Sequence, residues 1–100
     1  MIHELKIKPA YFNVVHNGDK SFEVRKKDRN YKVGDYLALN EYNGGYTGRT
    51  ALVKVKYILD NNNFCKSGFV IMGIERCDIV KHSENLTVVN SGAMTTAGQW

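Results

Sequence analysis

The chain has 100 residues, of which 43% are hydrophobic and 24% charged, and its formal net charge is +4 at pH 7. This length and composition predict one domain with a modest core of its own. Charged residues interrupt the N-terminus, and no apolar run approaches the roughly 20 residues that span a bilayer, so neither a secretory signal nor a membrane segment is expected. Cys65 and Cys77 lack the spacing of a zinc site or a disulfide framework, so we expect reduced, partly buried thiols, no metal and no cofactor.

The first predicted elements are a strand and a short helix. His3 to Lys8 alternates apolar and charged side chains, which predicts a strand with one face in the core. Pro9 fits the first turn of a helix, because its missing N–H would have no partner there, and the predicted helix Pro9–His16 buries Phe12 and Val15. Gly18 suits the left-handed position that follows a helix.

The next predicted strand, Ser21 to Lys26, carries the strongest candidate site. Its two apolar side chains point to one face, whereas Glu23 and Arg25 point to the other and meet Lys20 on a surface backed by the core. Arg25 can hold a phosphate or a base edge, Lys20 adds positive charge, and Glu23 can accept from a base amino group. The alternative is a structural ion pair on a solvated strand, which contributes about 0–1 kcal/mol.

Three further strands complete the predicted sheet. Tyr36 to Tyr42 is followed by the hairpin signal Asn43-Gly44-Gly45, because Asn and Gly adopt positive φ at little cost. Thr50 to Leu59 is the longest predicted strand, and Phe69 to Ile74 is the last strand of the core. One early helix with five or six short strands predicts an α+β fold in the form of a small mixed barrel.

Residues 78–100 differ in composition from the rest of the chain. They are rich in Ser, Thr, Asn and Gly, and only Leu86 to Val89 has the pattern of a strand. We therefore predict a domain of residues 1–77 and a polar C-terminal extension of residues 78–100 with one edge strand. Trp100 either anchors this extension or belongs to a partner surface.

Positive charge is concentrated in one part of the sequence. Six of the 14 Lys and Arg residues lie between Lys20 and Lys32. Such a region attracts phosphate backbones, and neighbouring tyrosines offer rings on which bases stack. Arg29 lies within this region and is predicted to extend the contact. The alternatives are a solvated loop that keeps the protein soluble and a hairpin end with a stacked tyrosine.

Several short motifs occur in a distinctive order. The central motif is G-x-K-x-x-E-x-R. It is preceded by H-x-L-K-x-x-P and followed by a basic loop and V-G-D, then by Y-T-G-R and a hydrophobic G-I strand. In this sequence the motifs fall at Gly18, Lys20, Glu23 and Arg25, at Val33 to Asp35, at His3 to Pro9, at Tyr46 to Arg49, and at Val70 to Ile74. Over about residues 2 to 77 this order resembles the ASCH family of PUA-like domains, and more narrowly the small ASCH-like proteins of bacteria and their phages.

The resemblance implies a PUA-like ASCH barrel of five to six strands with one principal helix. It also implies a site at Lys20, Glu23 and Arg25, in a cleft between the helix and the mouth of the barrel. The matching Y-T-G-R motif implies that Tyr46 and Arg49 lie at the rim of this cleft and extend the contact. We predict that this cleft binds RNA or a modified nucleotide, in a cytoplasmic protein of a bacterium or a phage-infected cell. The expected protein is a monomer or weak dimer with no membrane partner, and Arg25→Ala is expected to weaken binding with almost no effect on thermal unfolding.

Two alternatives follow from the same segment. Some ASCH-fold proteins are small amidohydrolases that act on acylated cytidines, and they carry a threonine where this chain has Glu23. Lys20 and Glu23 would be the catalytic residues of such a hydrolase, with Glu23 as general base for water, because Ser21 is in the wrong register to replace the missing hydroxyl. The other alternative is a phage-encoded inhibitor that contacts a host or rival protein through the basic loop and the C-terminal extension.

Overall fold

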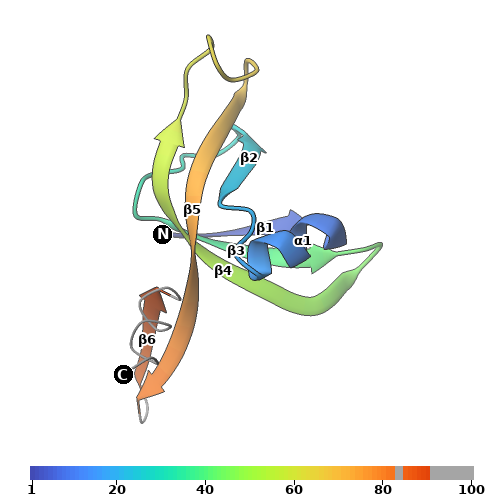
Figure 1. The fold of residues 1–100 in the computed structure, drawn as a ribbon, viewed down its shortest axis with the longest axis vertical. Coiled ribbons are helices and arrows are strands. Elements are labelled where there is room, and N and C mark those ends of the chain that lie inside the picture. Colours follow the sequence, from blue (N-terminus) through green and yellow to red (C-terminus); the bar gives the residue numbers. More distant parts are fainter. Residues whose placement is uncertain (83–84, 91–100) are drawn as a thin grey trace.

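The computed structural model describes residues 1–82 and 85–90. These residues contain six strands and one helix, joined by turns and loops (Figure 1). In chain order the elements are β1 (Ile2–Ile7), α1 (Pro9–His16), β2 (Phe22–Lys26), β3 (Tyr36–Tyr42), β4 (Tyr46–Leu59), β5 (Phe69–His82) and β6 (Asn85–Asn90). The predicted α+β class is confirmed, as are the bounds of the helix and of the strand at residues 36–42. β4 begins at Tyr46 rather than Thr50, because pairing across the turn extends the hairpin.

The strands follow one another in the order β1-β3-β4-β5-β2, and β6 pairs with the C-terminal part of β5. β1 and β3 are parallel, and the other neighbours are antiparallel. Residues 46–54 of β4 pair with β3, and residues 52–59 pair with β5. The register of β4 against β5 shifts between Val55 and Tyr57, and β4 bends along its length (Figure 1).

The sheet is not closed into a barrel, which corrects that part of the sequence prediction. β1 and β2 are the two ends of the strand order and do not pair with each other. The number of strands and their motifs do not determine whether the terminal strands meet. One side chain spans the gap instead, since Arg25 of β2 donates from Nη2 to the backbone carbonyl of Lys6 in β1 at 2.7 Å.

The core lies between α1 and the inward faces of the strands. Phe12 and Val15 of α1 are buried, as predicted. Full burial of such a side chain contributes about 1.5–3 kcal/mol, which holds a helix too short to persist alone. The strand residues in this core include Leu5, Ile7, Leu37, Leu39, Ala51, Val53, Val55, Val70, Met72 and Ile74.

β2 turns its charged face inward, contrary to the prediction. Phe22 and Val24 are each 48% exposed, whereas Glu23 is only 3% exposed. The alternation of side chains along the strand was predicted correctly, but alternation alone does not say which face is inside. Glu23 lies inside because two cationic side chains satisfy its carboxylate, as described below.

The C-terminal part of the fold begins within β5. This strand continues past Ile74 to His82 and pairs there with β6, in the region where the sequence predicts one edge strand. The boundary between residues 77 and 78 stays a prediction, although it falls inside a strand. Residues 83–84 and 91–100, including Trp100, lie outside the described residues.

Two further properties concern the described chain as a whole. Cys65 and Cys77 are free and buried. Within residues 1–82 and 85–90, no helix combines the length and the apolar composition that crossing a membrane requires.

A buried polar contact fixes the start of β1. His3 donates from Nε2 to Oδ2 of Asp35 at 2.8 Å, and the ring of Tyr31 lies against the imidazole at 4.8 Å between centroids. Asp35 also accepts from the backbone N–H of Lys32 at 3.0 Å and from the N-terminal ammonium of Met1 at 3.4 Å. The hydrogen bond from His3, supported by the other two, lowers the pKa of Asp35 below its ordinary value of 3.8 despite burial.

We expect Asp35→Asn to lower the free energy of unfolding at neutral pH by about 1 kcal/mol, because the buried His3 loses its ionised acceptor. Because the pKa of Asp35 is lower in the folded state than in the unfolded state, the ionised carboxylate stabilises the folded protein. The stabilisation is therefore present above the ordinary pKa of 3.8 and is lost as the pH falls through the lower folded-state value. Urea unfolding of both proteins from about pH 7 to about pH 2 measures this, and a pH-independent difference would contradict it.

Candidate functional site

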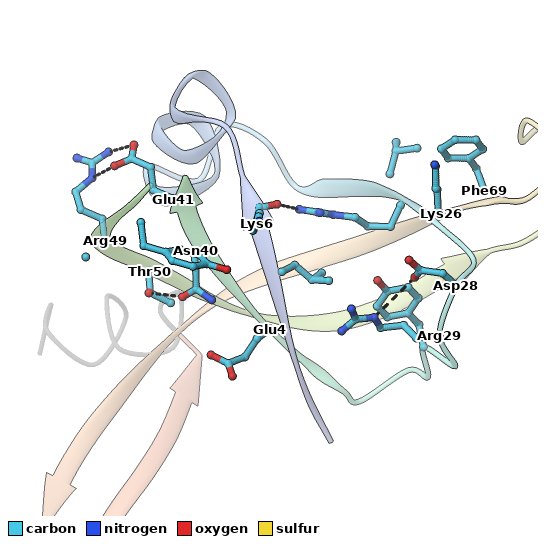
Figure 2. A pocket seen from close by; sticks show the side chains of 16 residues that line it. Glu4, Lys6, Lys26, Asp28, Arg29, Asn40, Glu41, Arg49, Thr50 and Phe69 are labelled. Carbon is cyan, nitrogen blue, oxygen red and sulfur yellow. Dashed lines mark hydrogen bonds and ion pairs between the residues drawn. The ribbon is translucent and has the colours of Figure 1, made fainter. Parts of the chain in front are cut away.

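A groove with a volume of about 840 Å³ lies along the facing edges of β1 and β2 (Figure 2). Its walls are residues 4–6 of β1, residues 24–26 of β2, three residues of the β2–β3 loop, residues 40 and 41 of β3, four residues near the start of β4, and Phe69. Binding sites for small molecules have volumes of roughly 300–1,000 Å³, so the groove is large enough for a nucleotide-sized ligand.

The groove is positively charged and partly aromatic. Five Lys and Arg side chains line it against three Asp and Glu side chains. The basic residues are Lys6, Arg25, Lys26, Arg29 and Arg49, and the acidic residues are Glu4, Asp28 and Glu41. Rings of Tyr31, Tyr46 and Phe69 form part of the same surface. A surface of this kind attracts anions that also present flat rings.

The structure separates the six residues predicted to bind ligand into two groups. Arg25, Arg29, Tyr46 and Arg49 line the groove, whereas Lys20 and Glu23 do not. Lys20, Glu23 and Arg25 nevertheless converge as predicted. Their meeting point is inside the protein, beneath β2, rather than on the surface of a cleft.

Glu23 is the centre of this buried cluster. Lys20 donates from Nζ to Oε1 of Glu23 at 2.9 Å, and Arg25 donates from Nε to Oε2 at 2.6 Å. The ammonium of Lys20 also lies 4.8 Å from the ring centroid of Tyr11 and 5.3 Å from that of Phe22. The predicted ion pair of Glu23 exists, but it is buried rather than solvated, so the cluster supports the wall of the groove.

Arg49 and Glu41 form a second cluster, between the β3–β4 hairpin and α1. Arg49 donates from Nε and Nη2 to Glu41 at 3.0 Å each (Figure 2). It also donates from Nη2 to Oδ1 of Asn13 at 2.7 Å. Its guanidinium lies 4.3 Å from the ring centroid of Phe12. The hydroxyl of Thr47, at 2.6 Å, and then Arg49 lower the pKa of Glu41. Through Arg49, the Y-T-G-R segment thus links the β3–β4 hairpin to α1.

The cationic groups that remain available lie at the β2 end of the groove. The side chain of Lys26 has no ion pair or hydrogen bond with any described residue. Among the described residues, the ion pair of Arg29 is with the exposed Asp28, with 3.8 Å between Nε and Oδ1. Lys6, at the opposite end, lies 4.2 Å from the ring centroid of Tyr42. Lys26 and Arg29 are therefore the two cations best placed to meet an anionic ligand.

Sequence reasoning missed much of the groove. Glu4, Lys6 and Thr50 are exposed and Asn40 is half-buried, and all four point outward from neighbouring strands. Their outward direction could have been found from the alternation of apolar residues. The proximity of Glu4 and Lys6 to Asn40 could not have been found in this way, because it depends on the parallel pairing of β1 with β3. Within the part of the chain that the structure describes, no three His, Cys, Asp or Glu residues converge as a metal site.

Comparison with known proteins places the chain in a family. Residues 2–74 match the family model described as "Domain of unknown function (DUF3850)". The chain belongs to the DUF3850 family. The matched region extends from β1 into β5 and includes every residue that lines the groove.

The chain is also similar to a phage protein. It is 45% identical over 60 residues to the "Uncharacterized 12.9 kDa protein in GpA 3'region" of Escherichia phage P2. The alignment covers 59% of this chain and 55% of the phage protein, so the chain spans about half the length of that relative.

The buried position of Glu23 changes the expectation for Arg25→Ala. Removing the guanidinium leaves the Glu23 carboxylate with one cationic partner and unlinks β2 from the Lys6 carbonyl. We therefore expect the free energy of unfolding to fall by about 1–3 kcal/mol. Chemical denaturation of the variant beside the unaltered protein measures this loss.

Lys27→Ala is the matched control for that variant. Lys27 forms an ion pair with Asp60 at 2.8 Å, and the two side chains are 46% and 41% exposed. Loss of such an exposed pair costs about 0–1 kcal/mol. Equal destabilisation by the two substitutions would show that burial of Glu23 does not matter as described.

Proposed function

We propose that the groove binds single-stranded RNA or a modified nucleotide. The observation that carries the proposal is the combination of available cations with aromatic rings along one continuous surface. Lys26 and Arg29 lie beside the wall that contains Phe69, and Tyr46, at 65% exposure, presents a ring at the other end. Phosphates are held by such cations, while bases stack on such rings.

The shape of the groove favours an extended ligand over a duplex. It follows the edges of two strands and reaches a hairpin, so a chain lying in it would pass both cations and rings. In single-stranded RNA the bases are free to stack on protein side chains, whereas a duplex keeps them paired.

We further propose that the family is related to the ASCH domains of the PUA-like superfamily. The G-x-K-x-x-E-x-R motif supports this, because its Lys, Glu and Arg form one buried cluster. In this proposal the open sheet, bridged by Arg25, corresponds to the closed barrel of that superfamily. The likeness to a phage protein supports a bacterial or phage-infected cytoplasm as the site of action.

The geometry gives less support to the two alternative functions. A hydrolase that uses Glu23 as general base would need a carboxylate oxygen directed at the substrate. Both oxygens of Glu23 are held by cations, and neither Glu23 nor Lys20 lines the groove. An inhibitor acting through the extension would use residues such as Trp100 that lie outside the described chain. RNA binding is therefore the function that the groove supports best.

We expect the double variant Lys26→Ala, Arg29→Ala to bind single-stranded RNA at least about tenfold more weakly than the unaltered protein at low salt. Two fewer phosphate contacts should also make the negative slope of log affinity against log salt shallower by about 1.4, at about 0.7 for each contact. Fluorescence polarisation of a labelled oligonucleotide at several salt concentrations measures both quantities.

The control is Lys8→Ala, Lys56→Ala, which removes the same charge at two exposed positions outside the groove. It should change affinity and salt slope far less. Equal losses in the two double variants would mean that net charge, rather than the groove, governs binding, and would contradict the proposal.

A further inference from the structure

The three carboxylates of the groove differ in their partners. Glu41 is held by Arg49 and Thr47, and Asp28 lies 3.8 Å from Arg29. Glu4 has no hydrogen bond or ion pair with any residue that the structure describes. A groove that attracts anions therefore contains one carboxylate that has no partner among the described residues.

Glu4 belongs to a set of polar side chains that we call the polar row: Glu4, Lys6, Asn40 and Thr50. Glu4 and Lys6 point to the same face of β1, Lys6 lies opposite Asn40 in β3, and Asn40 lies opposite Thr50 in β4. Figure 2 shows Glu4 on the same side of β1 as the hydrogen-bonded pair of Asn40 and Thr50.

The polar row presents one anionic acceptor, the Glu4 carboxylate, and several donors. Thr50 donates to Oδ1 of Asn40 at 2.6 Å, which leaves the amide NH₂ of Asn40 as a donor. Lys6, opposite Asn40 in the sheet, adds an ammonium that lies over the ring of Tyr42. The Glu4 carboxylate can only accept. It repels a phosphate, so a ligand that occupies this part of the groove must offer a hydrogen-bond donor there.

Base edges differ in whether they meet this requirement. Cytosine, adenine and guanine carry an exocyclic amino group beside a ring nitrogen, and a carboxylate accepts from such a group. Uracil presents a single N–H between two carbonyl oxygens, and a carboxylate repels those two oxygens. The donors of Lys6 and Asn40 suit the acceptors that adjoin the amino group.

We propose that the polar row selects a base with an exocyclic amino group, while Lys26 and Arg29 hold the phosphates of the same strand. This inference rests on the proposed RNA-binding function and assigns its specificity to Glu4. The phosphate contacts lie in β2 and the following loop, and the base contacts lie in β1, β3 and β4.

Labelled oligocytidine, oligoadenosine and oligouridine of equal length provide the test. The unaltered protein should bind the cytidine or adenosine oligomer about five- to tenfold more tightly than the uridine oligomer. Glu4→Gln should remove this preference without weakening binding of oligouridine, because the amide replaces a charged acceptor by a neutral group. Fluorescence polarisation measures the affinities, and circular dichroism checks that the variant is folded.

Asp19→Asn is the matched control, because Asp19 is exposed, lies outside the groove and carries the same charge. It should leave the base preference intact. Equal affinity of the unaltered protein for all three oligomers would overturn the inference about Glu4 but not the proposed function. The inference would also be overturned if Glu4→Gln changed the affinity for all three oligomers by the same factor. Glu4 would then act by repelling the strand or by contacting a sugar. Failure to bind any of them would overturn both.

Discussion

The buried carboxylate of Glu23, held between Lys20 and Arg25, is the constraint on which the rest of the structure depends. An ionised carboxylate inside a protein is tolerated only when its oxygens are hydrogen-bonded to cations, and both partners come from the same segment of chain. Because β2 turns this charged face inward, Phe22 and Val24 face solvent. Arg25 then reaches the carbonyl of Lys6, so one guanidinium satisfies the carboxylate and links the two ends of an open sheet.

The groove is a consequence of that open arrangement. In a closed barrel the edges of β1 and β2 would pair with each other, and no space would remain between them. Here the edges stay apart, and their side chains and those of the adjoining loop and hairpin line the space. The charged residues near the groove thus fall into two groups. Buried clusters around Glu23 and Glu41 hold the walls in place. Among the described residues, Lys26 and Glu4 have no partner, and Arg29 has only the 3.8 Å contact with Asp28.

How much the sequence predicts depends on whether a feature is local. Pro9 and Gly18 delimit the helix through the backbone geometry that each favours, and so its bounds were predicted correctly. The inward face of β2 was not predicted, because an alternating pattern is the same from either side. Which side is buried depends on the pairing of β2 with β5 and on the contact of Arg25 with Lys6, which are distant in sequence. Four of the six predicted site residues line the groove. Glu4 was not predicted, because its place beside the residues of β3 depends on the pairing of β1 with β3.

The most direct test of the account is to map the contact surface by nuclear magnetic resonance during titration with a short single-stranded RNA. We expect chemical-shift changes to concentrate at Lys26, Arg29, Asn40 and Tyr46, all of which line the groove, with only small changes at Lys56 and Glu75 outside it. Shifts confined to residues outside the groove, or no shifts at saturating RNA, would contradict the claim that the groove is the site of recognition.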